Sequence, residues 1–197
     1  MSKAGIGDDT AVIAYDDEGG VIAARLVWML RTTGHEAAIL DGGLAAWRGT
    51  FASGPTTSEP ATFTPPVWPA QLLASVDEVT RADHVVIDAR DADRFRGERE
   101  PIDPRAGHIP GARSVPCREH LDATGRLRPI SELRERLRVA GVVEGRDVIS
   151  YCGSGVTACH NLLVVEHVGL GQGRLFPGSW SQYSADPERP IATGSEP

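Results

Sequence analysis

Cys152 is the residue whose position suggests chemistry most directly. It follows the apolar run DVISY and precedes the stretch VTACHNLLVVEH, with Gly153, Ser154 and Gly155 between them. This pattern predicts a strand, a tight turn of small residues and the start of a helix. A thiol in such a turn faces converging backbone N–H groups and the positive end of the helix dipole, and both stabilise a thiolate. The pattern therefore predicts a nucleophile, with a buried structural thiol as the alternative.

The neighbours of Cys152 support this interpretation. Glycines allow the backbone to curl around one atom and to adopt positive φ angles. Ser154 and Thr157 can add hydroxyl donors to the same turn. Cys159 falls among apolar residues of the predicted helix, where we expect it to be a core residue. We assign no function to Cys117.

A cysteine in such a turn could also serve a phosphatase. A phosphate dianion requires a guanidinium that binds two of its oxygens, and only arginine supplies one. The sixth residue after the cysteine is Ala158, and residues 152–158 contain neither Arg nor Lys. This composition disfavours dephosphorylation and suits a sulfur atom carried on the cysteine.

The elements that must position Cys152 occur twice in the chain. Residues 12–47 align with residues 148–183 at a constant offset of 136, without gaps. Each copy predicts a strand, a tight turn, a helix, a second strand and a short helix, which favours a duplicated unit. Asp16 takes the place of Cys152 in the first copy, so only the second turn can perform thiol chemistry.

The two copies differ in what precedes them. Residues 71–147 precede the repeated strand in the second copy, whereas only residues 1–11 precede it in the first. We therefore expect a partial, inactive domain at 1–54, a Pro-, Ser- and Thr-rich linker at 55–70 and a complete catalytic domain at 71–197. An N-terminally truncated domain of this kind leaves an unpaired sheet edge and an uncovered apolar face unless it docks on the second unit.

The loop CGSGVTA resembles the active-site loop of the tandem-domain rhodanese family of sulfurtransferases, in particular the 3-mercaptopyruvate type. The stretches YDDEGG, LDGGLAAW, DARDADRFRG, GHIPGA and FPGSW are similar to that family as well. The resemblance implies an α/β, rhodanese-like fold, with a central parallel sheet flanked by helices and one complete domain preceded by a partial copy.

The resemblance also implies roles for individual residues. Cys152 would become a persulfide, and Ser154 would assist catalysis. In the family this serine works with an acid and a histidine from the front half of the first domain, which the partial first copy lacks. Arg94 would bind the carboxylate of the donor, and Arg105 would be a second arginine at the same site. The remaining predicted substrate-binding residues are the other members of the loop, Gly153, Gly155, Val156 and Thr157.

We therefore expect a sulfurtransferase that takes sulfur from 3-mercaptopyruvate, or from thiosulfate, and needs no cofactor. The expected acceptors are cyanide, a small thiol or a thioredoxin-like protein. The alternative is a truncated, catalytically weak sulfur-carrier or binding module.

Composition excludes several other classes of function. The net charge of −7 and the scattered arginines give no nucleic-acid footprint and no membrane-binding patch. No apolar run approaches the roughly 20 residues that span a bilayer, so we expect a soluble cytoplasmic protein. Three cysteines without zinc-knuckle spacing predict at least one free thiol and no metal site.

Overall fold

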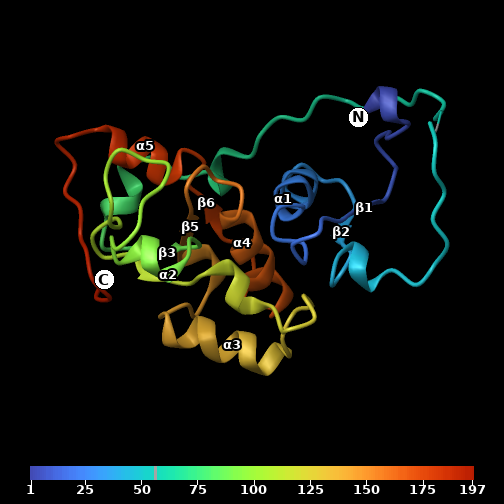
Figure 1. The fold of residues 1–197 in the computed structure, drawn as a ribbon. Coiled ribbons are helices and arrows are strands. Elements are labelled where there is room, and N and C mark those ends of the chain that lie inside the picture. The colour runs from blue at the N-terminus through green and yellow to red at the C-terminus, as the bar shows by residue number, and fades with distance from the viewer. Residues whose placement is uncertain (56) are drawn as a thin grey trace.

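The computed structural model describes residues 1–55 and 57–197 and contains two parallel β-sheets with helices packed against them. One sheet has two strands, and the other has four strands in the order β4-β3-β5-β6. Figure 1 shows the layers: the small sheet, then helix α1, then helix α4, then the large sheet. The predicted α/β class, with parallel sheets flanked by helices, is confirmed.

The first unit is small. It contains β1 (Val12–Ala14), α1 (Ala24–Thr32) and β2 (Ala37–Ile39), with the short 3-10 helices η1 (Ser2–Ala4) and η2 (Leu44–Ala46) on either side. Helix α1 is followed by Gly34, which has a φ of 87°, and this left-handed conformation closes a helix without steric cost.

The second unit provides the large sheet and the remaining helices. Its strands are β3 (Val85–Asp88), β4 (Arg113–Ser114), β5 (Val148–Tyr151) and β6 (Arg174–Leu175). Its α-helices are α2 (Ala92–Phe95), α3 (Ile130–Val139), α4 (Ala158–His167) and α5 (Ser179–Ala185). Four short 3-10 helices complete this unit. Two precede β3, η3 (Ala70–Leu72) and η4 (Glu78–Thr80), and two lie between the later elements, η5 (Cys117–His120) and η6 (Gly145–Asp147).

The strand pairing repeats with the offset of 136 that the alignment predicts. Ile13 pairs with Ala38 in the small sheet, and Ile149 pairs with Arg174 in the large one. The hydrogen bond from Leu40 N to Ala14 O recurs as the bond from Phe176 N to Ser150 O. Equivalent residues therefore occupy equivalent places in the two units.

The two units differ in what covers the outer face of the repeated strand. Ile149 and Tyr151 are fully buried in β5, whereas their equivalents in β1, Ile13 and Tyr15, are 65% and 57% exposed. In the second unit this face packs against residues from 74–112, and β3 pairs with the edge of β5. Among the described residues nothing equivalent lies over β1, so the exposed side chains Ile13, Tyr15, Leu44 and Trp47 form an uncovered apolar face.

The other side of the first unit is buried against the second. Helix α1 packs along α4, and the buried residues of both helices belong to one continuous apolar cluster. Val27, Trp28 and Leu30 supply the contribution of α1. Arg31 Nη1 also lies 3.1 Å from Glu166 Oε1 across the boundary. The first unit thus depends on the second for its core.

The predicted linker at 55–70 runs along the outside of the molecule, and its residue 56 lies outside the described residues. The rest of this segment has no regular structure until η3 begins at Ala70. It is fastened to the N-terminal segment, where Asp8 N donates to Thr62 O at 3.0 Å and Thr64 N donates to Asp8 Oδ1 at 2.7 Å. No helix among the described residues has the length and hydropathy needed to cross a bilayer.

Two buried histidines lie beside each other where the units meet. The ring centroids of His120 in η5 and His160 in α4 are 5.9 Å apart, and His120 Nε2 is 3.1 Å from Asn161 Oδ1. Burial is the main reason that the pKa of His120 falls to about 3 and the pKa of His160 to about 4. The folded chain therefore holds both imidazoles neutral.

The shared core predicts that the two units unfold together. Leu30→Ala, at 3% exposure, should lower the free energy of unfolding of the whole chain by about 2–5 kcal/mol, because it leaves a cavity in the apolar cluster that the units share. Urea unfolding followed by far-UV circular dichroism and by tryptophan fluorescence should give one coincident transition. Ile13→Thr, on the uncovered face, is the control and should change stability by less than about 0.5 kcal/mol. A separate cooperative transition for residues 1–50 would contradict this arrangement.

The buried histidines predict acid sensitivity. The unfolded chain binds protons on them near pH 6.5, whereas the folded chain resists protonation down to a pH of about 3 or 4, so stability falls as the pH drops below about 6.5. Between pH 7.5 and 5.5 each histidine should remove about 1 kcal/mol from the free energy of unfolding measured in urea. His160→Gln should remove about half of this loss, whereas His167→Gln, exposed on the same helix, should leave it intact. An unchanged pH dependence in His160→Gln would show that other groups cause the loss.

Candidate functional site

The predicted nucleophile lies in the loop that joins β5 to α4. Cys152 directly follows the last residue of β5 and is only 2% exposed. The backbone N–H of Gly155 donates to Cys152 Sγ at 3.1 Å. Gly155 has a φ of 76°, and a Cβ atom there would lie 2.7 Å from Pro177 O, so both the conformation and the space require glycine. The loop therefore curls around the sulfur atom as the sequence predicts.

The first residues of α5 hydrogen-bond to the backbone of Cys152. Ser179 Oγ accepts a hydrogen bond from Cys152 N at 3.1 Å and donates to Phe176 O at 2.9 Å. Trp180 N donates to Cys152 O at 2.9 Å. Ser179 has a φ of 52°, an unfavourable angle for a non-glycine residue that is tolerated here because these bonds hold the backbone. Sequence reasoning missed Ser179, although the stretch FPGSW contains it.

The remaining loop residues differ in their exposure to solvent. Gly153, Val156 and Thr157 are half-buried, and Ser154 is exposed to solvent. The Thr157 hydroxyl lies against the thiol of Cys117. Ser154 is therefore the polar side chain of the loop that faces solvent, where an incoming molecule would meet it.

The equivalent loop in the first unit surrounds the carboxylate of its own residue Asp16 with backbone amides. The Asp16 carboxylate accepts four backbone hydrogen bonds, from Gly20 N at 2.6 Å, Ala23 N at 2.7 Å, Ile22 N at 2.8 Å and Glu18 N at 2.9 Å. Burial acts to raise the pKa of Asp16, but these four bonds outweigh it and lower the pKa. Gly19, the equivalent of Gly155, has a φ of 71°. This type of loop thus stabilises negative charge with backbone amides alone.

Arg94 in α2 reaches the edge of the Cys152 loop. Its Nη1 atom lies 3.7 Å from the place where a Cβ atom of Gly153 would stand. Glu100 and Asp103 hold the guanidinium from the other side, with Nη2 2.6 Å from Glu100 Oε1 and 3.3 Å from Asp103 Oδ2. Burial acts to raise the pKa of Glu100, but the bonds from Arg94 and from backbone N–H groups lower it. Within the described residues Nη1 has no hydrogen-bond partner, so it remains available to a ligand.

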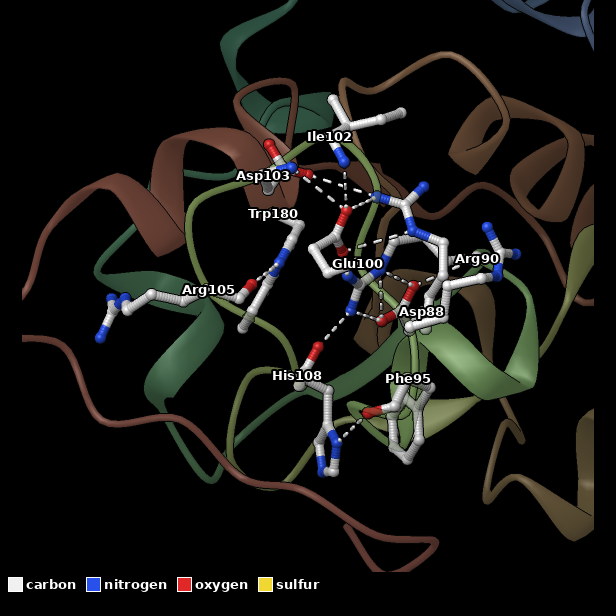
Figure 2. A network of polar contacts seen from close by, with 12 residues as sticks. Asp88, Arg90, Phe95, Glu100, Ile102, Asp103, Arg105, His108 and Trp180 are labelled. Atoms are coloured by element: carbon white, nitrogen blue, oxygen red, sulfur yellow. Dashed lines mark hydrogen bonds and ion pairs between the residues drawn. The ribbon is translucent and has the colours of Figure 1, made fainter.

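Asp88 and Arg90, at and just beyond the end of β3, form a buried ion pair. Arg90 Nη2 is 2.7 Å from Asp88 Oδ2 and also donates to Gly107 O at 2.7 Å. Both side chains are almost fully buried, and the guanidinium lies 4.6 Å from the ring centroid of Trp180. Figure 2 shows this pair beside Glu100, which joins it to Arg94. The pair therefore helps to position Arg94, because Glu100 binds both Arg90 and Arg94.

Arg105 does not join this site. In Figure 2 its side chain points away from Asp88, Arg90 and Glu100. Its guanidinium donates instead to backbone carbonyls at the end of α5 and in the chain that follows it, including Ser184 O at 2.8 Å and Arg189 O at 3.0 Å. The structure thus uses Arg105 to hold the C-terminal segment in place, whereas the family resemblance implies a second arginine at the substrate site.

The other two cysteines are buried thiols. Burial is the main cause that raises the pKa of Cys117 to about 12, and it raises the pKa of Cys159 to about 12 as well. All three cysteines are free. Cys117 and Cys159 are therefore protonated at neutral pH, and neither competes with Cys152 as a nucleophile.

The chemistry open to this site is nucleophilic attack by a thiolate on a soft atom. The polar group that contacts the sulfur atom is the backbone amide of Gly155, and residues 152–158 contain no cation. Arg94 stands at the side of the loop, where it can bind the anionic group of a reactant.

Comparison with known proteins agrees with this geometry. The model of the rhodanese-like domain matches residues 69–186. A probable 3-mercaptopyruvate sulfurtransferase of Pseudomonas aeruginosa is 40% identical over 96% of this chain and 70% of its own length. A putative thiosulfate sulfurtransferase of Mycobacterium tuberculosis, SseB, is 38% identical over 99% of this chain and 71% of its own length.

Solved structures show the same fold. The 3-mercaptopyruvate sulfurtransferase of Leishmania major is 36% identical, with a TM-score of 0.81 over 93% of this chain and 54% of its own. A complex of EanB with ergothioneine is 23% identical, with a TM-score of 0.84 over 98% of this chain and 53% of its own, and supports the fold alone. The chain spans about half the length of these solved structures. On the family match and the identity to its curated relatives, this chain belongs to the rhodanese-like domain family.

Proposed function

We propose that this protein is a sulfurtransferase that carries sulfur on Cys152 as a persulfide. The observation that carries the proposal is the 3.1 Å contact from Gly155 N to Cys152 Sγ, in a loop whose counterpart binds a carboxylate. Relatives named as 3-mercaptopyruvate or thiosulfate sulfurtransferases support the same activity. Free thiols suit a reducing compartment such as the cytoplasm.

In the first step the Cys152 thiolate attacks the sulfur atom of the donor. With 3-mercaptopyruvate, a sulfur–sulfur bond forms and the carbon–sulfur bond breaks, with its electron pair leaving on carbon as the enolate of pyruvate. The thiol proton of the donor stays on the outer sulfur, and water or a nearby acid protonates the enolate. The residues from Gly153 to Thr157 surround the sulfur atoms, and the exposed Ser154 hydroxyl donates to the oxygen of the departing enolate.

Arg94 selects an anionic donor. Its Nη1 atom binds the carboxylate of 3-mercaptopyruvate beside the loop. We place thiosulfate second, because a dianion would gain from basic residues in the loop and residues 152–158 contain none. Glu100 and Asp103 fix the guanidinium, so the donor meets a preoriented partner.

In the second step a nucleophile attacks the outer sulfur of the persulfide, and the inner sulfur leaves as the Cys152 thiolate. Cyanide, a small thiol or a thioredoxin-like protein can serve as the acceptor, since each is a soft nucleophile. The net result is the transfer of one sulfur atom, and the cysteine returns to its starting state.

A second candidate is a sulfur carrier that forms the persulfide but turns over slowly. Two observations favour it: Cys152 is only 2% exposed, and Arg105 is bound to backbone carbonyls. An adduct that forms without sustained pyruvate release would identify this candidate.

Persulfide formation is tested by mass spectrometry. Incubation with 3-mercaptopyruvate should add about 32 Da to the intact protein, located on the Cys152 peptide, and reduction should remove it. Cys152→Ser should lose the adduct and all pyruvate release, whereas Cys159→Ala should retain both. A protein that takes up no sulfur from either donor would end the proposal.

The role of Arg94 is tested by Arg94→Lys, which keeps the charge beside Glu100 and Asp103 but loses the planar fork. KM for 3-mercaptopyruvate should rise about 10- to 100-fold with little change in the melting temperature. Arg96→Lys, exposed and paired with Glu98, is the matched control and should behave as the wild type. An equal KM in both variants would remove Arg94 from the donor site.

A further inference from the structure

An arginine of the first unit contacts the loop of the second. Arg25 lies in the first turn of α1, and its Nη1 atom donates to Gly155 O at 3.0 Å. The same atom is 3.7 Å from Cys159 Sγ, and the guanidinium lies 5.9 Å from the ring centroid of Trp28. Gly155 is thus held on both sides, since its N–H faces Cys152 Sγ and its carbonyl faces Arg25.

The contact constrains the direction of a second amide. The peptide group between Gly155 and Val156 is trans, so its N–H points opposite to its carbonyl. Because Gly155 O accepts from Arg25 Nη1, and from Cys159 Sγ at 3.4 Å, the N–H of Val156 points in the opposite direction within the peptide plane. A charged donor makes the Arg25 hydrogen bond stronger than a neutral one would. Arg25 therefore helps to fix the orientation of the peptide group that follows the Gly155 amide, which faces the sulfur atom.

Arg25 also adds charge to a loop that has none. The ionisable groups that face Cys152 come from several elements: Cys117 from η5, Cys159 from α4 and Arg94 from α2. The two thiols are neutral, and Glu100 and Asp103 compensate the charge of Arg94. Arg25 has no carboxylate partner among its described contacts, so its charge is left to act on the loop.

We propose that Arg25 is a positioning residue that holds the Cys152 loop in its anion-binding shape, so that thiolate formation in the second unit depends on the docked first unit. The relevance to catalysis rests on the proposed sulfurtransferase function. The acidity of Cys152 itself can be measured without any sulfur donor.

The test measures the rate of alkylation of Cys152 by iodoacetamide as a function of pH in the full chain, with peptide mass spectrometry to assign the modified cysteine. In Arg25→Met the midpoint of the profile should move to higher pH, and the rate at pH 7 should fall about 3- to 10-fold, because the thiolate loses both a charge and an ordered cradle. Arg25→Lys keeps the charge and should recover most of the rate.

The matched control is Arg31→Met, which removes the other charged contact between α1 and α4 but does not touch the loop. Its alkylation profile should equal that of the wild type. If Arg25→Met also matched the wild type, or if Arg31→Met shifted as much, the proposal would be wrong. Should Arg25→Met fail to fold, Arg25→Gln, which keeps a donor without the charge, must still show a raised midpoint.

Sulfur uptake from 3-mercaptopyruvate is measured in the same variants. A wild type that takes up no sulfur but shows the Arg25-dependent profile would refute the sulfurtransferase function and leave the positioning role intact. Normal uptake combined with an Arg25-independent profile would refute only the positioning role.

Discussion

The sulfur chemistry that we propose depends on one hydrogen bond, from the Gly155 amide to the Cys152 sulfur atom. Burial disfavours a charged sulfur, and it keeps Cys117 and Cys159 protonated. The thiolate that we propose for Cys152 is stabilised by the amide that points at it, and residues 152–158 contain no cation. The equivalent turn of the first unit also places backbone amides around a side chain, since four of them hold the Asp16 carboxylate, although the donors there are Glu18, Gly20, Ile22 and Ala23 and not the Gly155 equivalent, Gly19.

The loop retains its shape because contacts reach it from three directions. Ser179 and Trp180 bind the backbone of Cys152 from the start of α5. Arg94, fixed by Glu100 and Asp103, stands at one edge. Arg25 binds the outer carbonyl from the first unit, through the same helix that shares its core with α4. Docking of the first unit and the geometry of the sulfur site are therefore parts of one packing arrangement.

Local patterns predicted much of this correctly. The strand, turn and helix around Cys152 and the ungapped repeat follow from residue types at short spacing, which reflect backbone conformation directly. The contacts of Arg105 and Arg25 could not be predicted from such local patterns. The side chain of Arg105 is captured by carbonyls some 80 residues along the chain, and Arg25 reaches a loop 130 residues away. Long flexible side chains take partners that only the tertiary fold brings near, so spacing could not identify them.

The uncovered apolar face of the first unit has a consequence for the protein in solution. The apolar side chains of this face contact water instead of a core: Ile13, Tyr15, Leu44 and Trp47. Burying them against another surface is therefore favoured by the hydrophobic effect. Salts such as sulfate, which are excluded from protein surfaces, increase the cost of that hydration. Salting-out conditions should therefore drive self-association through this face before the interior is perturbed, and mild chaotropes should keep the chain dispersed.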